Sequence, residues 1–419
     1  MGSRTSETPL LPHQHLLIAA ATSPVCGAPE PALEQALAAP GIDWPCAIVL
    51  ATRHGLAQRL ACHLRRLHAG GQVPAWVAAK FGELYAGNAA RQQVVFRETA
   101  ALIGALHAAG IRCLVLKGVA LSVTAYADPV LRYFSDIDLL VNEPDYGGAG
   151  RAISPVGYAA VHIAGGSEIE CEFVKTVEED LLTATMAPEY DAAAPPDVLS
   201  RYARRVTVDI HRGLFRDAMG RMRRADSRAA WEAPRQASLP DGTRFCTLPP
   251  EMMLVHLAAH AADHAFSRLY FLIDMAAVVA HWGNTIEWQR TLHLALQLQV
   301  EDHLFTGLRL VRDHFGAQVP DEVGSLVERH SAPGPTLANI VRRAEARRGE
   351  LEMIRWRTAP RGVDRYAAVL RAMVPPLGEM RRLYGVRSGF AAALLYAYRP
   401  VQLAGRLARG LTRLAAGRP

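Results

Sequence analysis

The sequence predicts an α+β fold, in which a small mixed sheet is flanked by helices. Two short segments, 135–141 (SDIDLLV) and 205–211 (RVTVDIH), alternate between polar and apolar residues, as half-buried strands do. From Pro249 onward the apolar spacing is helical almost throughout, and the first 90 residues are mostly helical too. The predicted parts are a helical N-terminal segment (1–90), a core with the sheet (91–215) and a helical C-terminal region (216–419).

The composition is that of a globular protein with room for two or three domains. Of 419 residues, 50% are hydrophobic and 21% are charged, a balance that disordered chains do not have. The longest apolar run near the C-terminus, 390–398, is far shorter than the roughly 20 residues of a membrane-spanning helix. The six cysteines form no C-x-x-C pair and show no spacing typical of a disulfide framework. We therefore expect a cytoplasmic protein without a transmembrane segment.

Positive charge is concentrated at the C-terminal end. The net charge is +6, and residues 341–419 contain 17 arginines and five acids, so this region carries +12 and residues 1–340 carry −6. One interpretation is a solvated helical surface, and another is a contact surface for a phosphate-rich partner such as RNA. Lysine is rare in the chain, where it occurs only as Lys80, Lys117 and Lys175.

A strand followed by a lysine and a glycine precedes the first alternating segment. Helical spacing over 91–109 and again over 119–127 brackets a short predicted strand, 111–116 (IRCLVL). Lys117 and Gly118 therefore lie where a strand turns into a helix. Backbone N–H groups and one positive charge at such a turn can bind phosphates.

Three aspartates lie on the two alternating strands. Asp136 and Asp138 share one face of the first strand, and Asp209 shares a face of the second strand with His211. Hard divalent cations such as Mg²⁺ or Mn²⁺ bind carboxylates together with substrate phosphates. The pattern therefore predicts a metal site formed by Asp136, Asp138 and Asp209. His211 is open to two interpretations, a group that orients Asp209 or the nucleophile, and a structural histidine.

The run 117–141 (KGVALSVTAYADPVLRYFSDIDLLV), followed by 208–214 (VDIHRGL), resembles the uncharacterised bacterial nucleotidyltransferase family. This family lies within the polymerase-beta-like nucleotidyltransferase superfamily, and its pattern is KG…Y…R…DIDLLV…VDLHW. The first run is also similar to abortive-infection toxins of the same superfamily. Two positions depart from these patterns: Val119 follows the KG pair where the superfamily has Gly or Ser, and Arg212 stands where the closer family often has Trp.

The resemblance implies transfer of a nucleoside monophosphate from an NTP, expected to be ATP, to an acceptor with release of pyrophosphate. Asp136 and Asp138 would hold both metal ions, and Asp209 would bind the catalytic ion and help to deprotonate the acceptor. The residues that would bind the nucleotide are Lys117, Gly118, Arg132 and Ser135. The acceptor stays open among a small molecule, a peptide and an RNA.

Other functions also stay open at the level of the sequence. A catalytically degenerate relative would bind nucleotide as a regulator without turnover. A toxin-like nucleotidyltransferase would act on tRNA. A helical nucleic-acid-binding protein with an accidental D-x-D run is a further alternative, and it would bind RNA in a salt-dependent way without any need for NTP.

A row of histidines lies in the predicted helical region. His256, His260 and His264 recur every four residues, so they share one helical face. Along a helix they span about 12 Å, too far for all three to bind one ion. We therefore expect these side chains to face the substrate cleft or to contact each other in a helical core, rather than to bind zinc.

Overall fold

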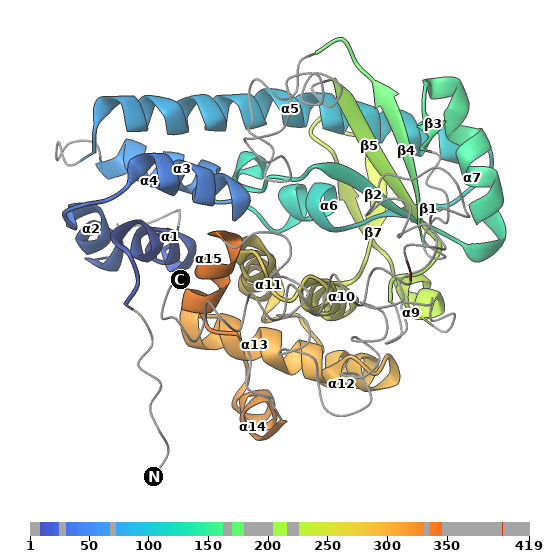
Figure 1. Ribbon diagram of the computed structural model, residues 1–419. Coiled ribbons are helices and arrows are strands. Elements are labelled where there is room, and N and C mark those ends of the chain that lie inside the picture. The colour runs from blue at the N-terminus through green and yellow to red at the C-terminus, as the bar shows by residue number, and fades with distance from the viewer. Residues whose placement is uncertain are drawn as a thin grey trace.

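The computed structural model has an α+β fold, as the sequence predicts (Figure 1). A seven-stranded mixed sheet forms one part, and helices from both ends of the chain pack beside it. The structure describes residues 9–24, 31–67, 73–161, 170–179, 204–215, 226–330, 335–345 and 396, and the statements below concern these residues. Of the basic region 341–419, for which RNA contact is predicted, only residues 341–345 and 396 are among them.

The strands are β1 (Cys113–Val115), β2 (Asp136–Val141), β3 (Ala159–Ala160), β4 (Glu170–Thr176), β5 (Arg205–His211), β6 (Arg235–Ser238) and β7 (Arg244–Thr247). They form one sheet in the order β3-β4-β5-β2-β1-β7-β6. β2 runs parallel to β5 and β1 runs parallel to β7, whereas the other neighbours are antiparallel. β2 and β5 coincide with the two alternating segments, so both strand predictions are confirmed.

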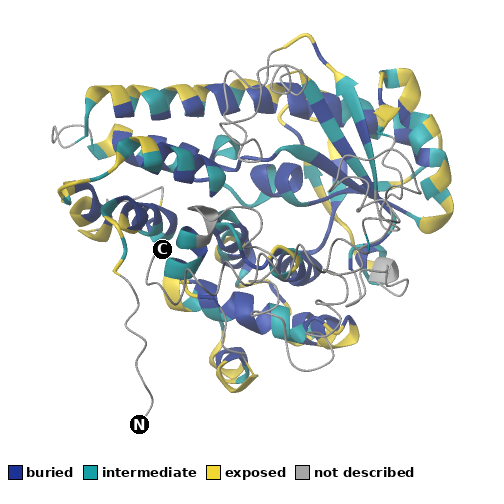
Figure 2. Ribbon diagram, in the orientation of Figure 1, coloured by how far each residue is buried: buried dark blue, intermediate teal, exposed yellow. Residues whose placement is uncertain are grey.

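Burial explains why β2 and β5 lie near the centre of the sheet. Ile137, Leu139 and Val141, the predicted core face of β2, are fully buried, and so is Val208 on β5. Leu140, on the opposite face of β2, is also fully buried, so this strand is covered on both faces (Figure 2). The two strands therefore form a packed base for the polar side chains that they carry.

The helices before the sheet are α1 (Pro12–Thr22), α2 (Pro31–Ala38), α3 (Trp44–Arg53), α4 (Ala57–Leu67) and α5 (Ala75–Ala108). The helix predicted over 91–109 is part of α5, which begins directly after Pro74. Proline is tolerated there because the first backbone N–H groups of a helix have no intrahelical partner. Gly110, with φ of +73°, follows the C-terminal end.

α5 holds the segment that leads into β2. Gln92 Nε2 donates a hydrogen bond of 2.8 Å to the carbonyl oxygen of Arg132. Arg91 donates to the carbonyl oxygens of Phe134 and Ser135, the latter at 2.8 Å. All three carbonyl groups lie just before β2, so α5 fixes the chain at the point where the aspartates begin.

The connections around β2 are short helical pieces: α6 (Lys117–Thr124), η2 (Pro129–Leu131), η3 (Glu143–Asp145), α7 (Tyr146–Ile153) and η4 (Ser154–Val156). After β5 come α9 (Asp226–Glu232), α10 (Pro250–Asp263), α11 (Leu269–Trp282), α12 (Trp288–Gln297), α13 (Glu301–Phe315), α14 (Asp321–His330) and α15 (Leu337–Glu345). α15 packs against α1 and α3, so helices from the two ends of the described chain meet. None of the described helices is long and apolar enough to cross a membrane.

The division into three parts stays a prediction. α5 continues across residue 90, where the first boundary was placed, and β6 and β7 join the sheet from beyond residue 215, the second boundary. One buried apolar cluster extends from α1 to α15. The N-terminal helices, the sheet and the C-terminal helices therefore share a continuous core.

A buried histidine joins the N-terminal helices to α11. His54, directly after α3, is fully buried, and its Nδ1 accepts a hydrogen bond of 3.2 Å from the Leu269 backbone N–H. Burial, and next the positive charge of Arg268, lower the pKa of His54 to about 3. In the unfolded chain this histidine has a pKa of about 6.5, so below pH 6.5 it is protonated there but stays neutral in the folded protein. The free energy of unfolding therefore falls as the pH drops below 6.5.

Replacing His54 tests this acid sensitivity. In His54→Asn the side-chain oxygen can accept the same hydrogen bond but does not titrate. Between pH 7 and pH 5 the free energy of unfolding of the wild type should fall by about 2 kcal/mol more than that of the variant. Urea unfolding at both pH values measures the difference, with exposed His107→Asn as the control. Identical pH dependence in wild type and His54→Asn would contradict the assignment.

Candidate active site

The strand register brings two of the predicted carboxylates side by side. In the parallel pairing of β2 with β5, Asp138 lies directly opposite Asp209. On the other side of β2, the Leu116 backbone N–H donates to the Asp138 carbonyl oxygen at 2.9 Å, so Lys117 follows immediately beside the same residue. Three neighbouring strands therefore deliver Lys117, Asp138 and Asp209 to one place.

Lys117 occupies the turn between β1 and α6, as predicted. Its φ of +41° lies in the left-handed region, which costs a non-glycine residue about 1 kcal/mol or more. In this conformation Lys117 Nζ lies 2.7 Å from Asp138 Oδ1. The lysine thus contacts a predicted metal ligand directly, in addition to lying at the turn where phosphate binding is expected.

Gly118 has a packing reason to be glycine. A Cβ atom at this position would lie 2.4 Å from Phe134 Cβ, far closer than real Cβ contacts. Phe134 is itself buried just before β2. The close approach of α6 to the start of β2 therefore requires a residue without a side chain, and this requirement holds independently of any phosphate.

The charges of Asp138 and Lys117 stabilise one another. Burial acts first and would raise the pKa of Asp138, but Lys117 and His211 outweigh it and hold that pKa well below its usual value. Burial would likewise lower the pKa of Lys117, but the carboxylates of Asp138, Asp136 and Asp209 raise it. Both groups therefore carry their charges at neutral pH.

Asp136 stands at the start of β2, opposite Thr207 of β5, and is half-buried. Its negative charge contributes to the raised pKa of Lys117, so the carboxylate lies within electrostatic reach of the ammonium group. The structure thus places Asp136 at the edge of the cluster and Asp138 in its buried centre. Its predicted role as a metal ligand stays a prediction.

His211 joins the cluster, although the sequence assigned it no ligand role. One ligand atom from each of Asp138, Asp209 and His211 lies within 4.8 Å of the other two. His211 Nε2 is 2.9 Å from Asp138 Oδ1, and the histidine is 6% exposed. Two carboxylates and an imidazole are a donor set that fits a divalent cation. In the sequence, the only indication that His211 belongs to the site was strand alternation, which places it on the same face as Asp209.

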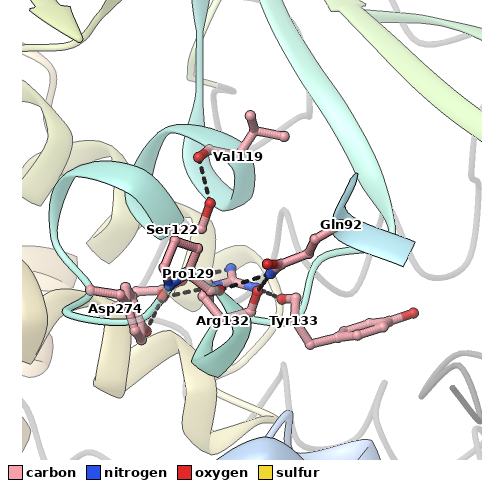
Figure 3. Close-up of polar contacts among 8 residues, drawn as sticks. Gln92, Val119, Ser122, Pro129, Arg132, Tyr133 and Asp274 are labelled. Atoms are coloured by element: carbon pink, nitrogen blue, oxygen red, sulfur yellow. Dashed lines mark hydrogen bonds and ion pairs between the residues drawn. The ribbon is translucent and has the colours of Figure 1, made fainter. Parts of the chain in front are cut away.

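Arg132, predicted to bind the triphosphate, is engaged with α11 (Figure 3). Its Nε and Nη2 each lie 2.7 Å from one carboxylate oxygen of Asp274, a bidentate geometry in a buried pair. The Tyr126 hydroxyl also donates to Asp274, at 2.6 Å, and the Tyr270 ring lies 4.5 Å from the guanidinium carbon. Arg132 therefore ties the segment before β2 to the helical region, and its contact with nucleotide stays a prediction.

Ser135, the other predicted nucleotide contact, is half-buried directly before β2. Its carbonyl oxygen accepts the hydrogen bond from Arg91 described above. The backbone of Ser135 therefore helps to fix the strand, and the role of its hydroxyl group in nucleotide binding stays a prediction.

The histidine row lies on α10, where its rings contact each other in succession. His260 and His264 meet edge to face with ring centroids 4.7 Å apart, and His264 stacks on Phe271 at 5.5 Å. His256 is 4% exposed, and neither of its ring nitrogens has a hydrogen-bond partner in the described part of the chain. Burial first, then Lys117 and His211, lower the pKa of His256 to about 3, so His256 is a neutral imidazole near the carboxylate cluster.

Comparison with known protein families gives one match. Residues 40–316 match the model of a family described as uncharacterised nucleotidyltransferases. The chain belongs to this family. The match runs from before α3 to just after α13, so it includes the whole sheet, the carboxylate cluster and the helices that carry Asp274. The resemblance seen in the sequence is confirmed, and the protein is an enzyme of the nucleotidyltransferase class. No curated protein matches the chain.

The contact at Gly118 generates a stability prediction. Gly118→Ala should lower the free energy of unfolding by about 1–3 kcal/mol, because the new Cβ overlaps Phe134 and the backbone must shift. Gly104 in α5 provides the matched control, because a Cβ there meets no atom within 4 Å. Gly104→Ala should instead stabilise the helix by about 0.5–1 kcal/mol. Urea unfolding of both variants measures the contrast, and equal effects would refute the packing argument.

The buried Arg132–Asp274 ion pair generates a second stability prediction. Asp274→Ala should destabilise the protein by about 3–5 kcal/mol, because it leaves a buried guanidinium without its carboxylate. In a double-mutant cycle, Arg132→Ala combined with Asp274→Ala should cost clearly less than the sum of the single changes. The exposed pair Arg97–Glu179 is the control, and its removal should cost at most about 1 kcal/mol. Additive effects at Arg132 and Asp274 would show that the pair is not coupled.

Proposed function

We propose that this nucleotidyltransferase moves a nucleoside monophosphate from an NTP, with ATP as the expected donor, to an acceptor. The acceptor oxygen forms a bond to the α-phosphorus, the bond from the α-phosphorus to the bridging oxygen breaks, and pyrophosphate leaves. The observation that carries the proposal is the register of β2 and β5, which sets Asp138 against Asp209 with Lys117 on the same carboxylate.

Asp136, Asp138 and Asp209 are the proposed ligands of Mg²⁺ or Mn²⁺. Among them, Asp138 and Asp209 belong to the group of ligand atoms within 4.8 Å, so the residues fit a divalent cation. Such a cation, when bound, stabilises the charge on the attacking and leaving oxygens. Asp209, less buried than Asp138, is the proposed acceptor of the proton from the attacking hydroxyl group.

Lys117 supplies positive charge for the triphosphate. Its ammonium group has three N–H donors, and the contact with Asp138 Oδ1 uses one of them. The remaining donors can bind a phosphate oxygen. Arg132 keeps a supporting role in this proposal, because Asp274 binds two of its guanidinium nitrogens.

The acceptor is proposed only as a class. A hydroxyl or phosphate group on a small molecule, a peptide or an RNA is compatible with this chemistry, since the core carries the reaction and the helical parts select the partner. The toxin-like alternative, with tRNA as the acceptor, is one case of the RNA class. A cell extract that contains RNA, peptides and metabolites is therefore the right first source of acceptor.

The test is transfer of label from each of the four NTPs, labelled in the α-phosphate, with Mg²⁺ or Mn²⁺ and cell extract. Asp138→Asn should reduce transfer and pyrophosphate release on the order of 100-fold or more, the size expected when a preorganised charged group is removed. Asp136→Asn should also reduce both. Asp321→Asn, on the exposed start of α14, is the matched control and should leave activity unchanged.

Two outcomes would overturn the proposal. One is label transfer by Asp138→Asn at the rate of the wild type. The other is binding of NTP by the folded wild-type protein without release of pyrophosphate in any condition, which would favour a regulator that binds nucleotide without turnover.

A further inference from the structure

A ring nitrogen of His211 lies next to the central carboxylate of the cluster. Its Nε2 and Asp138 Oδ1 are 2.9 Å apart. Two neighbouring ligands at about 2.1 Å from an octahedral ion are about 3.0 Å apart, because the distance is the bond length multiplied by √2. The histidine and the carboxylate therefore already have the spacing of two adjacent ligands of one ion.

The third donor comes from the same register. Asp209 lies opposite Asp138, and His211 follows Asp209 by two residues on β5, so both side chains leave the same face of that strand. All three ligand atoms lie within 4.8 Å of one another.

The donor set favours a particular class of metal. Mg²⁺ takes oxygen ligands and retains water, whereas imidazole nitrogen is preferred by divalent first-row transition ions. Two carboxylates and one imidazole suit an ion between these extremes, and Mn²⁺ accepts both donor types. An ion in this position would also leave further coordination sites for phosphate oxygens and water.

Lys117 competes with such an ion for one oxygen. Its Nζ is 2.7 Å from Asp138 Oδ1, the atom that His211 also contacts. An ion bound at Oδ1 must replace the ammonium and imidazole contacts there, and His211 must then carry its remaining proton on Nδ1. Removal of Lys117 should strengthen metal binding, whereas removal of His211 should weaken it if the imidazole is a ligand.

We propose that His211 is a direct nitrogen ligand in an Asp138–Asp209–His211 site that binds a divalent first-row transition ion, such as Mn²⁺, in preference to Mg²⁺. This inference rests on the proposed nucleotidyl transfer for the use of the ion. It adds His211 to the proposed set of three aspartate ligands. Because this ligand is a nitrogen, it also predicts which metal ion the site prefers.

The experiment measures metal binding rather than activity. Mn²⁺ and Mg²⁺ are titrated into the full chain by calorimetry, with and without a non-hydrolysable ATP analogue, and the Mn²⁺ complex is studied by pulsed electron paramagnetic resonance. The wild type should show coupling of Mn²⁺ to a ligand nitrogen. His211→Phe, which preserves the buried ring volume, should abolish that coupling and weaken Mn²⁺ binding at least about tenfold.

Three variants sharpen the result. Lys117→Met should bind Mn²⁺ about tenfold or more tightly, because a positive charge next to the ion is lost. His211→Asp, which gives an all-oxygen set, should reduce the preference for Mn²⁺ over Mg²⁺. His107→Asn, an exposed histidine on α5, should bind both ions as the wild type does.

The outcomes separate this inference from the proposed function. Mn²⁺ binding that needs Asp138 but shows no nitrogen coupling, or that is unchanged or tighter in His211→Phe, overturns the inference and leaves nucleotidyl transfer intact. If His211→Phe does not fold, the presence or absence of nitrogen coupling in the wild type decides whether the inference holds. No Mn²⁺ binding to the wild type, with or without the ATP analogue, overturns the inference and also the metal requirement of the proposed function.

Discussion

The buried charge of Asp138 is the constraint on which the site depends. A carboxylate that is 5% exposed within a sheet costs several kcal/mol unless it is paired and hydrogen-bonded. Lys117 and His211 supply these contacts, and they lie just after β1 and at the end of β5, the strands on either side of β2. The registers of β1 and β5 against β2 therefore determine which groups stabilise the charge of Asp138. The left-handed φ of Lys117 fits this view, because such strain persists only where the surroundings fix the residue.

A second buried charge pair connects this cluster to the rest of the molecule. Arg132 and Asp274 are 142 residues apart in the chain and join the segment before β2 to α11. From the other side, Arg91 and Gln92 of α5 bind carbonyl groups of the same segment. The strand that carries the central aspartate is thus held by an N-terminal helix and a C-terminal helix together. Both helices lie within the residues that match the family.

The elements that could be predicted from the sequence have a local periodicity of apolar residues. The features that were missed depend on contacts between residues distant in the chain. β2 and β5 were predictable because each has an apolar residue at every second position, whereas β6 (RQAS) is mostly exposed and has no such pattern. The full length of α5 was missed because its buried residues include polar ones such as Asn88, Arg91 and Gln92. Alternation also placed His211 beside Asp209, but its contact with Asp138 requires the register between β2 and β5. Periodicity alone cannot reveal that Arg132, one of 43 arginines, has Asp274 as its partner.

The charge balance of the site sets what can bind there. Three carboxylates and the polyanionic triphosphate repel one another, and Lys117 forms an ion pair with one of these carboxylates, Asp138. Arg132 adds little, because Asp274 neutralises it. His256 approaches the cluster as neutral imidazole, so it brings no positive charge either. Divalent cations neutralise the negative charge of a triphosphate and bind carboxylates, and we therefore expect nucleotide affinity to depend on the metal more than on any single basic side chain.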